Sequence, residues 1–109
     1  MAGVIERGDV RFYTFPAPDK SRPVLVLTRS SAIRYLGRVT VAPITSSIRG
    51  VPSEVVLDTE DGMKKTCAVN LHNVVTVSKD GLGRRLGYLS PEKMRVVCQA
   101  LGFALGCDA

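Results

Sequence analysis

Hydrophobic and polar positions along the chain predict a series of short strands followed by one C-terminal helix. Partial alternation predicts a first strand over Gly8–Phe15, and the continuous apolar run in Pro23–Thr28 predicts a second strand that is buried on both faces. The remaining β-rich runs are Arg38–Ile44, Glu54–Asp58 and Thr66–Val77. In the last and longest of them, Asn70 and His72 should share one face.

Turn-forming residues separate these runs. Pro16–Ser21 is a loop after the first strand, Asp61-Gly62 forms a tight turn, and Lys79–Gly81 closes the longest strand. Because Pro43 cannot donate to a sheet ladder, the strand that contains it should end, bulge or lie at a sheet edge there. After this interruption we expect the chain to leave the sheet.

The helix is marked at both ends. Ser90 is suited to cap it, Pro91 to begin its first turn, and Gly106 to end it. The apolar residues between them follow a period of about 3.6 residues and are Met94, Val97, Cys98, Leu101, Ala104 and Leu105. This stripe predicts a helix that packs one face against the strands.

These elements indicate one domain spanning residues 1–109. Its expected architecture is mainly β, a small and strongly bent antiparallel barrel of SH3-like or OB-like outline with a C-terminal amphipathic helix. A chain of 109 residues should bury one modest core but not two. No apolar run approaches the roughly 20 residues of a membrane helix, and Met1–Arg7 lacks the apolar segment of a signal peptide, so we expect a cytoplasmic protein.

The charge distribution indicates a polyanionic partner. The formal net charge is +5, and no acidic residue occurs from Lys20 to Ser53. The basic residues of that stretch are Lys20, Arg22, Arg29, Arg34, Arg38 and Arg49. Such a segment suits nucleic acid or an acidic protein, although a solvated basic surface without a ligand gives the same pattern.

The chain offers little for metal or disulfide chemistry. Cys67, Cys98 and Cys107 are an odd number of cysteines without a CxxC pair, and His72 is the only histidine. A disulfide framework and a structural zinc site are therefore not expected, and the thiols should be free and buried or half-buried. We expect no metal and no cofactor.

Two short motifs could contact a phosphate, whereas glycine-rich phosphate loops, GxSxG and HExxH are absent. In the first, Pro23 biases Arg22 toward an extended backbone, from which a guanidinium fork matches phosphate geometry. The second presents successive hydroxyls at Thr45, Ser46 and Ser47. An ordinary surface arginine and a self-satisfied Ser/Thr turn remain the alternatives. If the chain is an enzyme, RNA is a suitable substrate, because its own 2′-hydroxyl attacks the neighbouring phosphate once the strand is positioned.

Four motifs, in order along the chain, resemble the MazF/PemK family of toxin endoribonucleases: Arg7–Val10, Arg22–Leu27, Val41–Ser46 and Leu86–Ser90. The similarity runs from about Arg7 to Leu105. It implies an SH3-like barrel that forms a homodimer, and a toxin of a type II toxin–antitoxin system that a cognate acidic antitoxin neutralises. It also implies metal-independent cleavage of single-stranded RNA at a short preferred sequence. Attack by the 2′-hydroxyl leaves 2′,3′-cyclic phosphate and 5′-hydroxyl ends.

The resemblance also implies site residues. The family's catalytic arginine falls on Arg22, which stabilises transition-state charge, and its catalytic threonine falls on Thr45, which orients the scissile phosphate. Further RNA contacts are expected from Lys20, Ser21, Ser46, Ser47, Thr66, Asn70 and His72. The Pro16–Ser21 loop is short for the family and lacks a Gly-Ser-Glu element. Cys67 and His72 stand where a serine and an acidic residue are usual, and a lone strand histidine is also commonly structural.

Two other functions stay open on this fold. A gyrase-poisoning toxin like those of the CcdB family shares the architecture, so the fold alone does not separate it from a ribonuclease. The Arg22-Pro23 and Pro43-Ile44-Thr45 motifs favour cleavage. A non-catalytic RNA-binding module ranks third, because the chain has no tryptophan and only 6% aromatic residues to serve as stacking platforms.

Overall fold

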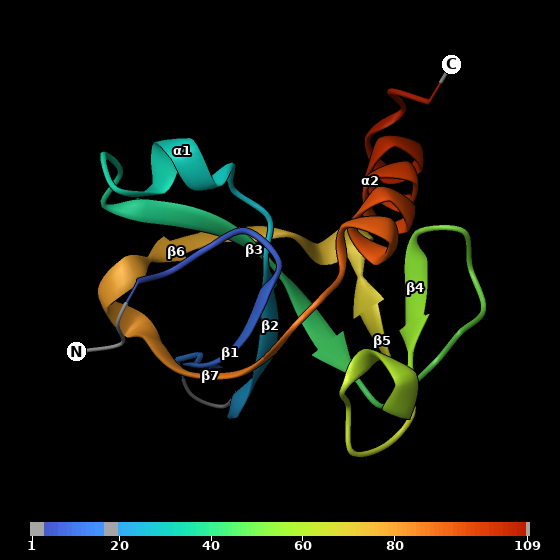
Figure 1. Cartoon of the computed structure of the whole chain (residues 1–109). Coiled ribbons are helices and arrows are strands. Elements are labelled where there is room, and N and C mark those ends of the chain that lie inside the picture. The colour runs from blue at the N-terminus through green and yellow to red at the C-terminus, as the bar shows by residue number, and fades with distance from the viewer. Residues whose placement is uncertain (1–3, 17–19, 109) are drawn as a thin grey trace.

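The computed structural model describes residues 4–16 and 20–108 and shows a bent antiparallel sheet with one long C-terminal helix (Figure 1). The strands are β1 (Asp9–Thr14), β2 (Ser21–Val26), β3 (Arg38–Thr45), β4 (Glu54–Leu57), β5 (Cys67–Asn70), β6 (Val75–Ser78) and β7 (Leu82–Tyr88). The helices are α1 (Ser30–Ile33) and α2 (Pro91–Leu105), with short 3-10 turns η1 (Thr59–Asp61), η2 (Leu71–Asn73) and η3 (Lys79–Gly81). The predicted mainly β architecture with a C-terminal helix is confirmed.

The strands are ordered β4-β5-β3-β2-β1-β7, and β6 also pairs with β3. All of these pairings are antiparallel. Part of the predicted loop over Pro16–Ser21 lies outside the described residues, at positions 17–19. Strand β1 ends at Thr14 and β2 begins at Ser21, so the connection lies one residue earlier than predicted.

Strand β2 is buried on both faces, as its apolar run predicts. Val24, Leu25 and Val26 are each 0% exposed. Leu25 belongs to a core cluster that includes Met94 and Val97 of α2, whereas Val24 and Val26 belong to a second cluster. The expectation of a single core was wrong, because the bent sheet receives α2 on one face and encloses a smaller cluster on the other.

Pro43 lies inside β3 and does not end it. One edge of β3 pairs with β2, where Pro43 stands opposite Val24. The other edge pairs with β6 up to Val41 and with β5 from Ile44 onward. Pro43, which has no N–H to donate, therefore lies between the segment of β3 that pairs with β6 and the segment that pairs with β5. The chain leaves the sheet after Thr45, one residue beyond the predicted end of this run at Ile44.

The segment Thr66–Val77 is not one strand, contrary to the prediction. Strand β5 ends at Asn70, whose side-chain oxygen accepts a hydrogen bond from His72 N at 3.1 Å. This local bond turns the backbone into η2, since asparagine side chains compete with sheet ladders for nearby N–H groups. Asn70 and His72 consequently do not share a strand face. The predicted turn over Lys79–Gly81 is present as η3.

Two elements were not predicted from the sequence. Strand β7 pairs with β1 but carries Gly83 and Gly87 and adjacent arginines, so it lacks a strand-like hydrophobic pattern. Helix α1 is a single turn of four residues, too short to show a helical period. It buries Ile33 in the smaller core cluster.

Helix α2 begins and ends where the sequence predicts. Ser90 caps it by accepting a hydrogen bond from Lys93 N at 3.1 Å, and Gly106 ends it with a φ of 75°. Its buried residues are Met94, Val97 and Ala100. Cys98 and Leu105 were expected on this face but are exposed, because they lie roughly 80–100° around the helix from its centre. No helix in the described part of the chain has the length and apolar content to cross a bilayer.

Gly8 fixes the entry into β1 in a conformation that favours glycine. Its φ is +94°. Its N–H donates to Val26 O at 2.9 Å, and its carbonyl accepts from Leu89 N at 3.0 Å. These bonds tie the start of β1 to the end of β2 and to the segment that leads into α2.

Gly8→Ala should lower the free energy of unfolding by about 1–3 kcal/mol, the usual cost of a non-glycine residue in such a backbone region. The added Cβ would also lie 3.5 Å from Leu89 O. Gly37→Ala is the matched control, because Gly37 has no positive φ and nothing lies within 4 Å of an added Cβ. Urea denaturation measures the difference, and equal stability of the two variants would contradict this role for Gly8.

Candidate active-site groove

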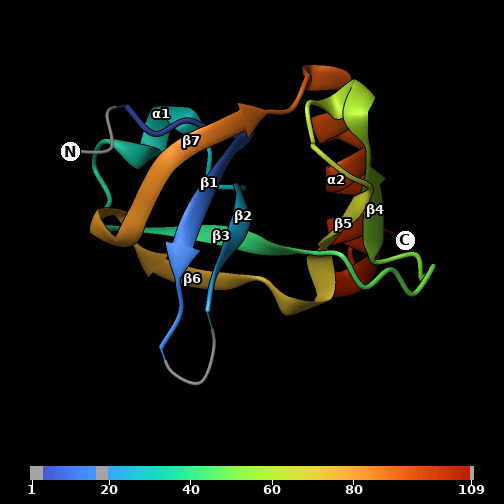
Figure 2. The same ribbon diagram turned by 90° about the horizontal axis from the view of Figure 1, so that it is seen from below.

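A groove of about 720 Å³ lies between β1, β2 and β7 on one side and the end of β3 with the segment leading into β5 on the other. In Figure 2, β1, β2 and β7 run together on one flank of the molecule, and β4, β5 and α2 form the other. The polar lining of the groove comprises Lys20, Ser21, Arg22, Thr45, Ser46, Lys64, Lys65, Arg84 and Arg85. No acidic residue is among the described residues that line it, so every charged side chain of that described lining is positive.

Arg22 stands on a rigid base at the start of β2. Its backbone pairs with Tyr13 of β1, and Pro23 follows it in the same ladder. The side chain is half-buried, and its guanidinium carbon lies 5.9 Å from the centre of the Phe15 ring. That is a cation–π distance. A guanidinium held by strand and ring loses little conformational freedom when it binds an anion.

Thr45 is the last residue of β3 and lines the same groove. The last pair of the β2–β3 register is Val24 with Pro43. Continued by two residues, the same register sets Arg22 opposite Thr45. Residues opposite one another in an antiparallel pair place their side chains on one face. Thr45 Oγ1 accepts a hydrogen bond from Ser47 N at 3.1 Å. Its O–H therefore remains a donor for a phosphate oxygen.

The other sequence-predicted contacts divide between the groove and the rest of the surface. Lys20, Ser21 and Ser46 line the groove with Arg22 and Thr45. The residues that do not line it are Ser47, Thr66, Asn70 and His72. His72 is exposed in η2, and its ring Nδ1 is hydrogen-bonded with Ser53 Oγ. Its contacts are those of a structural histidine at a turn.

Four cations of the groove were not predicted: Lys64, Lys65, Arg84 and Arg85. The lysines follow Gly62, which turns the chain after η1 with a φ of 87°. The arginines belong to β7, the strand without a hydrophobic pattern. Adjacent basic pairs were the only signal in the sequence, and no spacing rule places such pairs beside Arg22.

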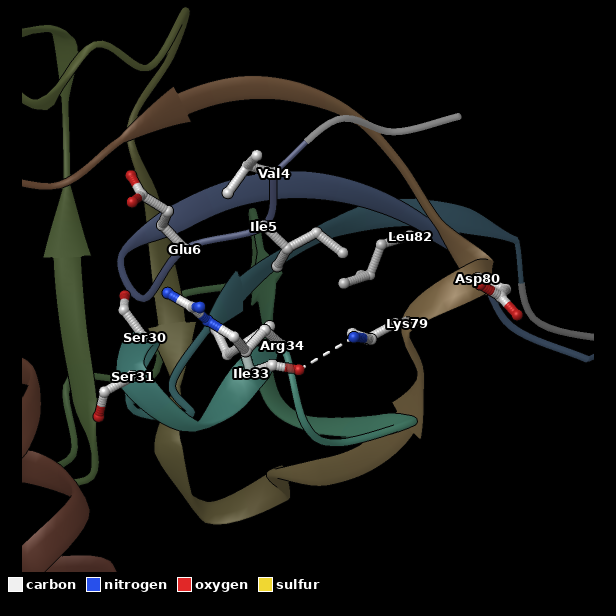
Figure 3. Close-up of a pocket in the computed structure, with 10 residues that line it drawn as sticks. All are labelled: Val4, Ile5, Glu6, Ser30, Ser31, Ile33, Arg34, Lys79, Asp80 and Leu82. Atoms are coloured by element: carbon white, nitrogen blue, oxygen red, sulfur yellow. Dashed lines mark hydrogen bonds between the residues drawn. The ribbon is translucent and has the colours of Figure 1, made fainter.

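The acid-free segment from Lys20 to Ser53 does not form one basic surface. Arg34, which belongs to it, lines a separate pocket of about 640 Å³ (Figure 3). Lys79 lines the same pocket, but so do Glu6 and Asp80. Because charges of both signs surround it, this pocket suits a polyanion less well than the groove does.

The groove offers positive charge and hydrogen bonds rather than acid–base groups. Its described lining includes neither a histidine nor a carboxylate. Burial raises the pKa of the Cys67 thiol, the negative charge of Asp61 raises it further, and Lys65 lowers it. Cys67 is therefore a neutral thiol at physiological pH. Among the described residues, no three His, Cys, Asp or Glu side chains gather to hold a metal ion.

The cysteines are free, as expected, but only Cys67 is buried. Cys98 and Cys107 were expected to be buried or half-buried and are exposed. Cys98 accepts a hydrogen bond from Arg7 Nη2 at 2.9 Å on the surface of α2. The helical period placed Cys98 among the apolar residues of α2, but it lies at the edge of the face that packs against the sheet.

Residues 6–105 match the family described as "PemK-like, MazF-like toxin of type II toxin-antitoxin system". The probable endoribonuclease MazF5 of Mycobacterium tuberculosis is 44% identical over 109 residues, covering 99% of each chain. The solved Mycobacterium tuberculosis toxin MazF-mt6 has a TM-score of 0.84 at 36% identity and covers 93% of this chain and 99% of its own. An endoribonuclease from a mycobacterial species, solved in complex with its cognate antitoxin, has a TM-score of 0.83 at 28% identity, with coverage of 94% and 95%.

Iodoacetamide at pH 8 should alkylate Cys67 about tenfold more slowly than Cys98 or Cys107, because thiolate is the nucleophile and Cys67 is buried with a raised pKa. Its rate should climb only at a pH above the ordinary range of a cysteine. Peptide mass mapping after timed quenching measures the three rates. Equal rates at pH 8 would count against this environment for Cys67.

Proposed function

This chain belongs to the PemK-like, MazF-like family of type II toxin–antitoxin toxins, and from that premise we propose that its groove cleaves single-stranded RNA. The observation that carries the proposal is that Arg22 and Thr45 line one groove together with six cations in all and, among the described residues, no acid. A polyanion is the ligand that such a groove favours. The whole chain, residues 1–109, acts as one toxin domain and meets its messenger RNA substrate in the cytoplasm.

The substrate supplies the nucleophile. The 2′-hydroxyl oxygen attacks the adjacent phosphorus, and the bond from phosphorus to the 5′-oxygen of the next nucleotide breaks. The 2′-hydroxyl proton passes to solvent, and the departing 5′-oxygen takes a proton from solvent. The products carry a 2′,3′-cyclic phosphate and a 5′-hydroxyl, and no metal ion takes part.

Arg22 and Thr45 stabilise the charge that develops on the non-bridging phosphate oxygens. A guanidinium keeps its proton above about pH 12, so Arg22 acts as a fixed positive charge and a bidentate donor rather than as a proton carrier. The Thr45 hydroxyl donates a further hydrogen bond and fixes the phosphate against β3. Groups held in place before the reaction stabilise the transition state without reorganising.

Lys20, Ser21 and Ser46 bind the strand on either side of the scissile phosphate. They supply charge and hydroxyl donors without reading bases, which positions the RNA but does not select a sequence. Preference for a short sequence then arises from the described groove walls, where Cys67 stands in place of the serine usual in the family.

An acidic antitoxin segment is the second partner of the groove. A disordered, negatively charged tail gains favourable contacts with the six cations and covers Arg22 and Thr45 when it orders. The solved relative in complex with its cognate antitoxin supports this partner. The toxin itself acts as a homodimer, the usual closed assembly for small soluble chains.

Purified protein should cleave a long unstructured RNA in the presence of EDTA, and Arg22→Ala and Thr45→Ala should each lower kcat by about 100-fold or more. Thr45→Ser should retain much of the activity because it keeps the hydroxyl. Arg38→Ala is the matched control, since Arg38 is an exposed arginine of the same acid-free segment outside the groove. End mapping by sequencing identifies the products and the preferred sequence.

Equal cleavage by wild type and Arg22→Ala, or dependence on added Mg²⁺, would overturn the mechanism. Gyrase inhibition that survives Thr45→Ala without RNA products would instead indicate a CcdB-like toxin. Salt-sensitive RNA binding without cleaved ends would indicate the non-catalytic RNA-binding module.

The homodimer is tested by light scattering coupled to size-exclusion chromatography. The expected mass is twice the 11.8 kDa of one chain at micromolar concentration. A mass of one chain across the concentrations at which RNA is cleaved would show that the active species is a monomer.

A further inference from the structure

On the premise that the groove cleaves RNA as proposed above, we infer that Arg85 is a second phosphate-binding arginine. It holds a phosphate next to the scissile one, and the buried carboxylate of Asp9 positions it. Asp9 and Arg85 come from β1 and β7, and Arg85 lines the groove that holds Arg22 and Thr45.

Asp9 is a buried carboxylate whose two oxygens have different partners. The residue is 1% exposed. Oδ2 lies 3.0 Å from Arg11 Nε and accepts a hydrogen bond from Glu6 N at 3.1 Å. Oδ1 lies 3.2 Å from Arg85 Nε as an ion pair and accepts no hydrogen bond from the described residues. The Asp9 carboxylate therefore contacts Arg11 through one oxygen and Arg85 through the other.

Arg11 neutralises Asp9 but does not reach the groove. It is 2% exposed, and its terminal nitrogens donate to the carbonyls of Gly83 and Val4 at 3.1 and 2.9 Å. Asp9 and Arg11 together carry no net charge, so the cluster of three carries the single positive charge of Arg85. The cluster thus presents a positive charge to solvent while its carboxylate stays inside.

Arg85 is held in place yet remains open to solvent. Its side chain is 49% exposed. Its guanidinium carbon lies 4.9 Å from the centre of the Tyr88 ring, and its Nε is turned toward Asp9. The terminal nitrogens form the opposite edge of the guanidinium, the edge that binds phosphate oxygens in a bidentate manner. An anchored guanidinium of this kind gives up less rotamer entropy on binding than a mobile lysine does.

The strand arrangement gives Arg85 and Arg22 different phosphates. Arg85 pairs with Arg11 across one edge of β1, and Arg22 pairs with Tyr13 across the other edge. Their backbones are therefore about 10 Å apart across the sheet. Each guanidinium also has its own anchor, Phe15 for Arg22 and Asp9 for Arg85. Separate anchors hold the two charges apart, so that one binds the scissile phosphate and the other a neighbouring one.

Arg85→Ala should raise the KM for a short RNA substrate about tenfold or more and leave kcat within about twofold, because the scissile phosphate keeps Arg22 and Thr45. In binding to an RNA with a 2′-deoxy nucleotide at the cleavage site, the slope of log affinity against log salt should fall by about 0.7, the value for one phosphate contact on a single strand. Arg85→Lys should recover part of the affinity, since a point charge lacks the fork. Arg95→Ala, an exposed arginine on α2 outside the groove lining, controls for the change in net charge.

Neutral methylphosphonate substitution identifies the phosphate. Each phosphate linkage around the cleavage site is replaced by a methylphosphonate, one at a time. At one neighbouring position the replacement should lower the RNA affinity of the wild type but leave the affinity of Arg85→Ala unchanged. Asp9→Asn tests the positioning role: it should raise KM less than Arg85→Ala, and the double variant should match Arg85→Ala alone. If Asp9→Asn fails to fold, the Arg85 variants still decide the phosphate contact.

An unchanged KM and salt slope in Arg85→Ala, together with a lower thermal midpoint, would show that Arg85 only neutralises Asp9. A loss of kcat at unchanged KM would place Arg85 at the scissile phosphate and also overturn the inference. Failure of the wild type to cleave any RNA would reject the ribonuclease function instead, and the salt slope of RNA binding would still test the Arg85 contact.

Discussion

Burial of β2 on both faces is the constraint on which the rest of the molecule depends. Val24 and Val26 on one side and Leu25 on the other leave this strand one register against β3. A slip of one residue would turn every side chain of the strand to the opposite face. The same register sets Arg22 opposite Thr45. Core packing therefore fixes the backbone that borders the groove. The side chains at the strand ends, such as Arg22 and Thr45, lie outside that core and are available to bind a ligand.

The groove concentrates positive charge along its described lining. Lys64, Lys65 and Arg84 approach from segments distant in sequence from Arg22, and no described acid lines the space between them. Like charges gathered in one place repel, and an anion relieves that repulsion when it binds. Under the proposed function, RNA and an acidic antitoxin segment would compete for the same cations, and the antitoxin would block the groove without changing its shape.

Several local signals in the sequence predicted the structure correctly. The Ser90 cap, the Gly106 end and the apolar strand before Thr28 are local signals, and the structure confirms each. The ordered motifs placed the chain in its family, which the match over residues 6–105 confirms. The turn at Asn70 was missed because one side-chain hydrogen bond outweighed the β propensity around it. Arg85 was missed because its nearness to the groove depends on strand topology, which no local pattern encodes.

Strand β3 is a single continuous element shared by two ladders, with β6 and then β5 along one edge. Pro43 marks the joint between them but leaves the strand unbroken. Because both ladders share the backbone of β3, opening of either ladder disturbs the strand that carries Thr45. For a toxin, this shared strand has a consequence: the position of Thr45 beside Arg22 depends on the integrity of both ladders and not on one half of the sheet alone.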